Sequence, residues 1–157
     1  MVTFIADNTL ARLGRWLRIL GCDTALDSRS AREILSDAQA LSQGRVILGR
    51  SPRLGARPEL RRIFFEIQSE NLDEQLREVA RAFPFASANL FSRCTKCNSV
   101  LGQSQSALLA PAKVPPRTRA WLDEFRECPA CGAVYWQGTH AERIRLFLSK
   151  VLENAAQ

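Results

Sequence analysis

The 157-residue sequence has no apolar run that approaches the roughly 18 residues needed to span a bilayer. Its first segment, Met1 to Asp7, reaches an acidic residue too early for a signal peptide. The cysteine count is five, an odd number that argues against a disulfide framework when no signal peptide is present. We therefore expect a soluble, cytoplasmic protein with no membrane partner.

Acidic residues are fewer than basic ones, 16 against 22, which gives a net charge of +6. An excess of arginine favours binding to polyanions, nucleic acid above all, because the guanidinium group can donate two hydrogen bonds to one phosphate. A basic surface that serves only solubility is the alternative. The arginines that we select as candidate nucleic-acid contacts are Arg12, Arg15, Arg18, Arg50 and Arg53.

Two CxxC pairs stand in the C-terminal half of the chain, at Cys94 and Cys97 and again at Cys128 and Cys131. Four thiolates in two such pairs can close a tetrahedral zinc site, and a closed shell of this kind is structural. A redox role for the pairs is the alternative, but no strand–helix–strand pattern surrounds them. The fifth cysteine, Cys22, is expected to pack as a small apolar residue.

Strand and helix patterns alternate four times before residue 84. Apolar segments predict strands at 2–6, 22–26, 45–48 and 63–67. Helical spacing of apolar residues predicts helices over 10–20, 30–41 and 72–83. We expect Asp7 or Asn8 to cap the first of these helices and Pro84 to stop the last. The alternation predicts an α/β fold with a parallel sheet flanked by helices, whose active crevice lies at the carboxyl ends of the strands.

The rest of the chain predicts a small zinc module. Val134 to Trp136 is expected to form a strand paired with Val100–Leu101, and Trp121 to Phe125 a short helical turn. A final helix opens at the capping-box pattern Thr139–Glu142. We expect the segment 86–92 to be a linker, and we therefore expect two domains, 1–90 and 91–157.

Five segments carry a family pattern: Phe4–Asp7, Leu13–Asp23, Glu74–Val79, Ser92–Asn98 and Val134–His140. Together they resemble the PIN-like ribonuclease family with an appended zinc ribbon, the family of the mut-seven C-terminal domain. The resemblance spans nearly the whole chain. It implies a PIN-like sheet, a zinc ribbon, and RNA as the ligand. It also makes His140, the only histidine, a candidate to face RNA or the crevice, with a plain surface position at a helix start as the alternative.

Metal-dependent phosphodiester cleavage needs several carboxylates from different strand ends to hold Mg²⁺ or Mn²⁺. Asp7 fits the first position, although a helix cap would explain it equally well. The resemblance places further acids where this sequence has Ala31 and Ser51, so two expected ligands are missing. Glu33 and Glu70 are the candidate substitutes, with charge at a helix N-terminus as the alternative for both.

Three hypotheses follow. The first is an RNA-binding protein of the PIN-like family that has lost most or all nuclease activity. The second is an active Mg²⁺- or Mn²⁺-dependent endoribonuclease that uses Asp7 with displaced carboxylates such as Glu33, Asp27 or Glu70. The third is an interaction module whose zinc ribbon and last helix dock a protein or ribonucleoprotein partner.

Overall fold

Four short apolar segments pair in parallel in the computed structural model, which describes residues 2–83, 89–105, 113–122 and 124–153. The strands are β1 (Phe4–Ala6), β2 (Thr24–Leu26), β3 (Val46–Gly49) and β4 (Phe64–Glu66), in the order β2-β1-β3-β4. Phe4 lies opposite Thr24 on one side and Val46 on the other. The predicted parallel sheet is therefore confirmed; β1, β2 and β4 are each shorter than the predicted segment, and β3 is shifted by one residue from the predicted 45–48.

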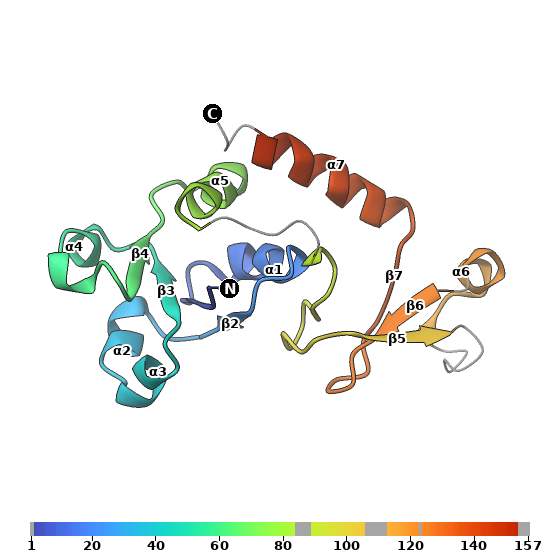
Figure 1. Ribbon diagram of the computed structural model, residues 1–157, viewed down its shortest axis with the longest axis horizontal. Helices are drawn as coiled ribbons and strands as arrows, with labels where there is room; N and C mark the ends of the chain where they lie inside the picture. Colours follow the sequence, from blue (N-terminus) through green and yellow to red (C-terminus); the bar gives the residue numbers. More distant parts are fainter. Residues whose placement is uncertain (1, 84–88, 106–112, 123, 154–157) are drawn as a thin grey trace.

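Alternation along the strands gives the sheet two apolar faces. Phe4 and Ala6 belong to the larger core, whereas Ile5 belongs to the smaller one. The helices that pack on the larger core are α1 (Ala11–Ile19), α5 (Leu72–Ala82) and α7 (Thr139–Glu153). The smaller core is covered by α2 (Ala31–Leu35), α3 (Ala38–Ser42) and α4 (Pro52–Gly55), and a 3₁₀ turn, η1 (Pro58–Leu60), follows them. Figure 1 shows these two helical layers on opposite sides of the sheet.

Two helix boundaries differ from the prediction. The N-cap of α1 is Leu10, without a side-chain cap, because a turn that joins the Leu10 N–H to the Asp7 carbonyl delays the helix. The predicted second helix is interrupted, since Asp37 accepts hydrogen bonds from the N–H groups of Gln39 and Ala40 and starts α3. Gly21 and Gly44 end their helices with positive φ, as a left-handed terminus requires. The predicted stop at Pro84 lies outside the described residues.

The C-terminal half of the chain contains an antiparallel ribbon that the sequence predicted only in part. Its strands are β5 (Gly102–Gln105), β6 (Glu124–Glu127) and β7 (Val134–Trp136), in the order β5-β6-β7. β7 pairs with β6, so the predicted pairing with Val100–Leu101 is wrong; Val100 forms an isolated bridge with Arg93 instead. Phe125 lies in β6 and not in a helical turn, because this places it in a small core with Val114. The helix before it, α6, spans Pro116–Trp121.

Helix α7 connects the ribbon back to the sheet. It begins directly after β7 and crosses over α1 towards α5 (Figure 1). Leu148 and Val151 are buried in the larger core of the α/β part. The sequence analysis grouped this helix with the ribbon, but it packs on the sheet and its helices. Among the described helices, none combines the length and apolar content that crossing a membrane requires.

Candidate functional site

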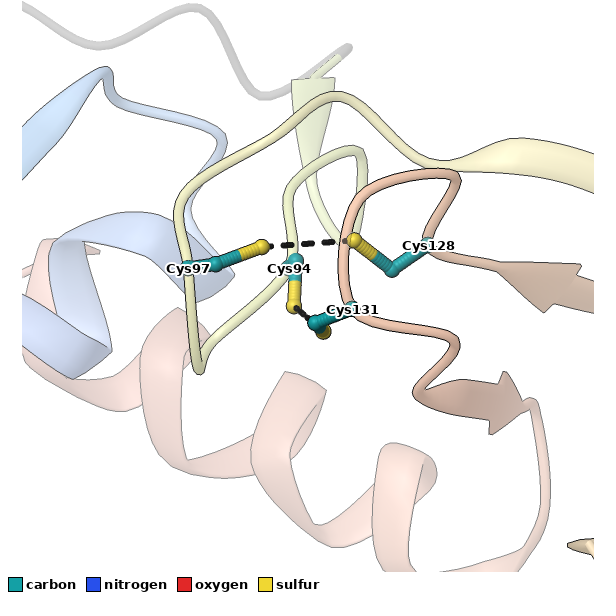
Figure 2. A group of neighbouring side chains, drawn as sticks. All are labelled: Cys94, Cys97, Cys128 and Cys131. Carbon is teal, nitrogen blue, oxygen red and sulfur yellow. Dashed lines mark hydrogen bonds between the residues drawn. The ribbon is translucent and has the colours of Figure 1, made fainter.

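The four cysteines of the two CxxC pairs converge on one point. Their sulfur atoms all lie within 4.8 Å of one another, with 3.6 Å between Cys94 and Cys131 and 3.3 Å between Cys97 and Cys128. Figure 2 shows the four side chains turned towards each other from two separate loops. Zinc–sulfur bonds of about 2.3 Å in a tetrahedron put the sulfurs about 3.8 Å apart. The group can therefore hold a metal ion such as zinc.

The two loops have the same backbone geometry. In each loop, the N–H of the first cysteine donates a hydrogen bond to the carbonyl of the residue five positions later. Cys94 donates to Ser99, and Cys128 donates to Ala133. The carbonyl of that cysteine accepts the N–H four residues on, from Asn98 or Gly132. Asn98 and Gly132 both have positive φ, so each turn closes through a left-handed residue. This repetition aims each pair of sulfurs at a shared centre.

The pKa values of Cys97 and Cys131 are shifted in opposite directions. Hydrogen bonding with Ser99 lowers the pKa of Cys97 to about 6. The pKa of Cys131 is raised to about 12: the backbone hydrogen bond at Ala133 lowers it, but burial and the neighbouring thiols outweigh that bond. Without a cation, four sulfurs at this spacing cannot all ionise, because like charges repel. A divalent ion removes that repulsion and binds the thiolate form.

Arg18 fixes the first cysteine loop to the α/β part. It is 4% exposed, and its Nε donates to the Thr24 carbonyl at 2.8 Å. Its Nη1 donates to the carbonyls of Thr95 and Lys96, both at 2.9 Å. These are the two residues between Cys94 and Cys97. Burial lowers the pKa of Arg18, and the nearby cysteines oppose that shift. The sequence proposed Arg18 as a nucleic-acid contact; the structure places its guanidinium inside, on the cysteine loop.

Asp23 makes a second connection between the two parts. Its carboxylate accepts from Asn98 Nδ2 at 2.8 Å and pairs with Arg93 at 3.3 Å. Arg45, which directly precedes β3, also pairs with it. Burial raises the pKa of Asp23, but the hydrogen bonds from Arg45 and Asn98 outweigh burial and leave it lowered. The cysteine loop is thus positioned by main-chain and side-chain contacts that do not depend on its metal.

We expect Arg18→Leu to lower the free energy of unfolding by about 2–4 kcal/mol, since three carbonyls lose their donor. For a chain of this size the melting temperature falls by roughly 5–15 °C. Metal release to a chelator is also faster, because the loop loses its anchor. Arg15→Leu, an exposed position one turn earlier on α1, is the control and changes stability by at most about 0.5 kcal/mol. Equal stability of the two variants, measured by thermal unfolding, contradicts the anchoring role.

A cleft of about 1300 Å³ lies between α1, the ribbon and the first turn of α7. Arg12 and Arg15 line it from α1, and His140 lines it from α7. Three predicted contacts are therefore brought together there. Both arginines are exposed and form no ion pair within the described part of the chain. The other cationic side chains of the lining are Arg93, Arg117 and Arg126, and its one acidic side chain is Glu124.

The other two predicted arginines lie elsewhere. Arg53 is in α4, and Arg50 directly precedes that helix. Figure 1 shows α4 at the opposite end of the molecule from the ribbon. Arg50 also pairs with Glu70 at 2.9 Å. These residues form a separate basic surface, which we call the α4 surface.

The tip of β1 forms a second, smaller site. Asp7 is 4% exposed, and its Oδ1 accepts from the N–H and the hydroxyl of Thr9, at 2.9 and 2.6 Å. A methyl group built on Gly49 would lie 3.0 Å from Asp7 Oδ2 and 2.8 Å from the Ala31 Cβ. Position 31 therefore lies beside the Asp7 carboxylate, where the family resemblance expects an acid. We call Asp7, Ala31 and Gly49 the Asp7 crevice.

The candidate acids do not gather at the Asp7 crevice. Within the described residues, the cysteine group is the one set of three or more side chains close enough to hold a metal. The Glu33 carboxylate accepts from the Ser30 N–H at 2.8 Å and completes a capping box. Glu70 is 86% exposed and pairs with Arg50. Each therefore has a local structural partner.

An arginine that the sequence analysis overlooked neutralises two more acids. Arg29 pairs with Asp27 at 2.8 Å and with Asp37 at 2.9 Å. Hydrogen bonds from Arg29 lower the pKa of both carboxyl groups. The Asn8 N–H bonds to the Arg29 carbonyl, so this residue lies next to the tip of β1. The spacing of Asp27 and Arg29, two apart after a strand, was the available signal.

A family model described as the Mut7-C RNAse domain matches residues 2–148. The match includes the sheet, the cysteine loops, the ribbon and most of α7. No curated protein and no solved structure matches the chain significantly.

Proposed function

Because this chain belongs to the Mut7-C RNase domain family, we propose that it binds RNA in the cleft between α1 and the ribbon and has lost most or all nuclease activity. The observation that carries the proposal is the contrast between the two sites. In the cleft, Arg12 and Arg15 have no ion-pair partner among the described residues, whereas the Asp7 crevice has alanine where a further carboxylate is expected.

RNA suits the cleft through its charge. Five arginines and His140 line it against one acidic side chain. Phosphates attract such a surface, and binding releases the counterions condensed on the nucleic acid. Aromatic side chains from α1 and the ribbon lie among the cations, which is the combination found in single-strand binding sites. Zinc held by the four cysteines serves this function by fixing the ribbon wall of the cleft.

Cleavage is not favoured at the Asp7 crevice. A hard divalent ion needs several oxygen ligands, and one carboxylate that already accepts two hydrogen bonds from Thr9 is a poor site. Ser51 stands at the other expected acidic position, and its hydroxyl cannot supply a negative charge. Each of the other candidate acids would have to break an ion pair or hydrogen bond before it could bind a metal ion at this crevice. These acids are Asp27, Asp37, Glu33 and Glu70.

We expect Arg12→Glu/Arg15→Glu to weaken binding of RNA by roughly 10- to 150-fold for each arginine, because hydrogen bonds to charged groups contribute about 1.5–3 kcal/mol. The slope of log K against log salt falls by about 1.4 if each arginine neutralises one phosphate of a single strand. Filter binding or fluorescence anisotropy across a salt series measures both quantities.

The matched control is Arg50→Glu/Arg53→Glu on the α4 surface, which changes the net charge by the same amount. We expect it to reduce affinity much less. Equal losses in the two variants indicate a general electrostatic effect and contradict the cleft as the binding site. No binding of RNA by the unaltered protein at low salt contradicts the proposed function itself.

A further inference from the structure

Trp121 is an exposed tryptophan in the wall of the cleft. Its side chain is 86% exposed, the highest value among the exposed large hydrophobic residues in the described part of the chain. It is the last residue of α6. Trp136 also lines the cleft, but it lies against Phe125 with the ring centroids 6.3 Å apart. Trp16 packs on Phe147 at 4.8 Å. The Trp121 ring is therefore the indole that the fold leaves open.

The surroundings of Trp121 are cationic. Arg117 lies one turn earlier on α6, so the two side chains share a face of the helix. Arg117 is exposed and has no ion-pair partner among the described residues. Arg12 and Arg15 line the same cleft from α1. A ligand that enters the cleft thus meets an open aromatic face and cations from two separate elements.

We propose that the cleft takes single-stranded RNA, with one unpaired base stacked on Trp121 and the adjoining backbone held by Arg117, Arg12 and Arg15. This rests on the proposed function and names the form of RNA that it takes. Every base has a π-face, and stacking on an aromatic side chain tolerates any sequence. In a duplex the bases are already stacked on each other, so a paired strand cannot offer a base to Trp121.

The charge of the cleft favours RNA over a protein partner for this tryptophan. An exposed tryptophan is also typical of the centre of protein interfaces. Arginine is common at such centres too, but Arg12, Arg15 and Arg117 have no carboxylate partner among the described residues, and uncompensated charge of one sign favours a polyanion. The exposed indole suits a ligand with aromatic rings, and the arginines suit a polyanion. Single-stranded RNA has both properties.

The test compares one labelled RNA of mixed sequence, single-stranded and annealed to its complement, by fluorescence anisotropy. We expect Trp121→Ala to weaken binding of the single strand about 5- to 150-fold, the range measured for loss of one base stack. Duplex affinity changes less than about twofold, since no base stacks there. Trp121→Phe keeps most of the affinity, because it retains a ring. Leu146→Ala, at a 63% exposed apolar position on α7 outside the cleft lining, changes neither affinity.

Two results separate this inference from the proposed function. If RNA binding depends on Arg12 and Arg15 but Trp121→Ala leaves it unchanged, or lowers single-strand and duplex affinity equally, the stacking role is overturned while RNA binding in the cleft stands. If the unaltered protein binds neither form of RNA, both fail. Cysteine-bound metal content and far-UV circular dichroism confirm that the Trp121 variants are folded.

Discussion

Cys128→Ser will abolish stoichiometric zinc binding and unfold the ribbon. Serine offers no thiolate, so only three of the four zinc ligands remain: Cys94, Cys97 and Cys131. Structural zinc contributes about 10–16 kcal/mol of apparent binding free energy in zinc-finger peptides, and in such modules that energy is folding energy. The core of the ribbon cannot replace it, because its described buried residues are only Val114 and Phe125.

The sheet will survive that substitution. Its two cores are built from β1–β4 and the helices around them, and α7 packs there through Leu148 and Val151. We therefore expect partial unfolding: the ribbon becomes sensitive to protease, and RNA affinity falls because one wall of the cleft is lost. Metal analysis and limited proteolysis measure these effects, and a chelator added to the unaltered protein should reproduce them. Cys22→Ala, which removes a buried cysteine outside the group, keeps the metal. A Cys128→Ser protein with full metal content and full RNA affinity contradicts this account.

The sheet and the cysteine group were predictable because their signals are local. Each strand is a short apolar run, and alternation along it determines which residues face which core, as Phe4 and Ile5 show. A CxxC loop brings two sulfurs together by its own turn geometry. Only the approach of the two loops to each other depends on the fold. It could still be predicted, because a structural zinc site requires four ligands and each loop supplies two.

The ribbon pairing was not predictable, because β6 has one apolar residue, Phe125, among charged neighbours. Without an apolar alternation, the register depends on β5 and β7, which pair with β6 from both sides. The local sequence predicted a helical turn that includes Phe125, but pairing with strands distant in the sequence makes this segment a strand. The cleft was missed for the same reason: its walls come from α1, α6 and β7, which are far apart in the sequence.

Arg18 shows how a helical stripe misleads. Arg12, Arg15 and Arg18 recur at a spacing of three, so the sequence assigns them one solvent-facing row. A helix has 3.6 residues per turn, and a spacing of three therefore drifts around its axis. With Leu13 and Leu17 buried, the drift carries Arg18 to the edge of the core, where the first cysteine loop covers it. The guanidinium then finds its hydrogen-bond partners in main-chain carbonyls, and it does so inside the protein.

Placing an acid back beside Asp7 should change both stability and chemistry. In Ala31→Asp, a second carboxylate enters a buried position next to the Asp7 side chain. Without a cation, we expect the free energy of unfolding to fall by about 3 kcal/mol or more, since a buried charge without a partner is costly. Mn²⁺ at a hundredfold excess over its dissociation constant returns about 2.7 kcal/mol. Ala31→Asn has the same shape without the charge, so its melting temperature should not respond to Mn²⁺.

Adding Ser51→Asp supplies the second missing acid. Ser51 is the N-cap of α4 and makes no side-chain capping hydrogen bond, so its replacement sacrifices no capping contact. We expect the Ala31→Asp/Ser51→Asp protein to cleave labelled single-stranded RNA in Mn²⁺, and Asp7→Asn in that background to stop it, because three carboxylates can hold an ion that activates water. The unaltered protein should show no Mn²⁺-dependent cleavage under the same conditions. If it cleaves RNA and Asp7→Asn removes that activity, then Asp7 works with displaced carboxylates, and the pairs that Arg29 makes with Asp27 and Asp37 must open to supply them.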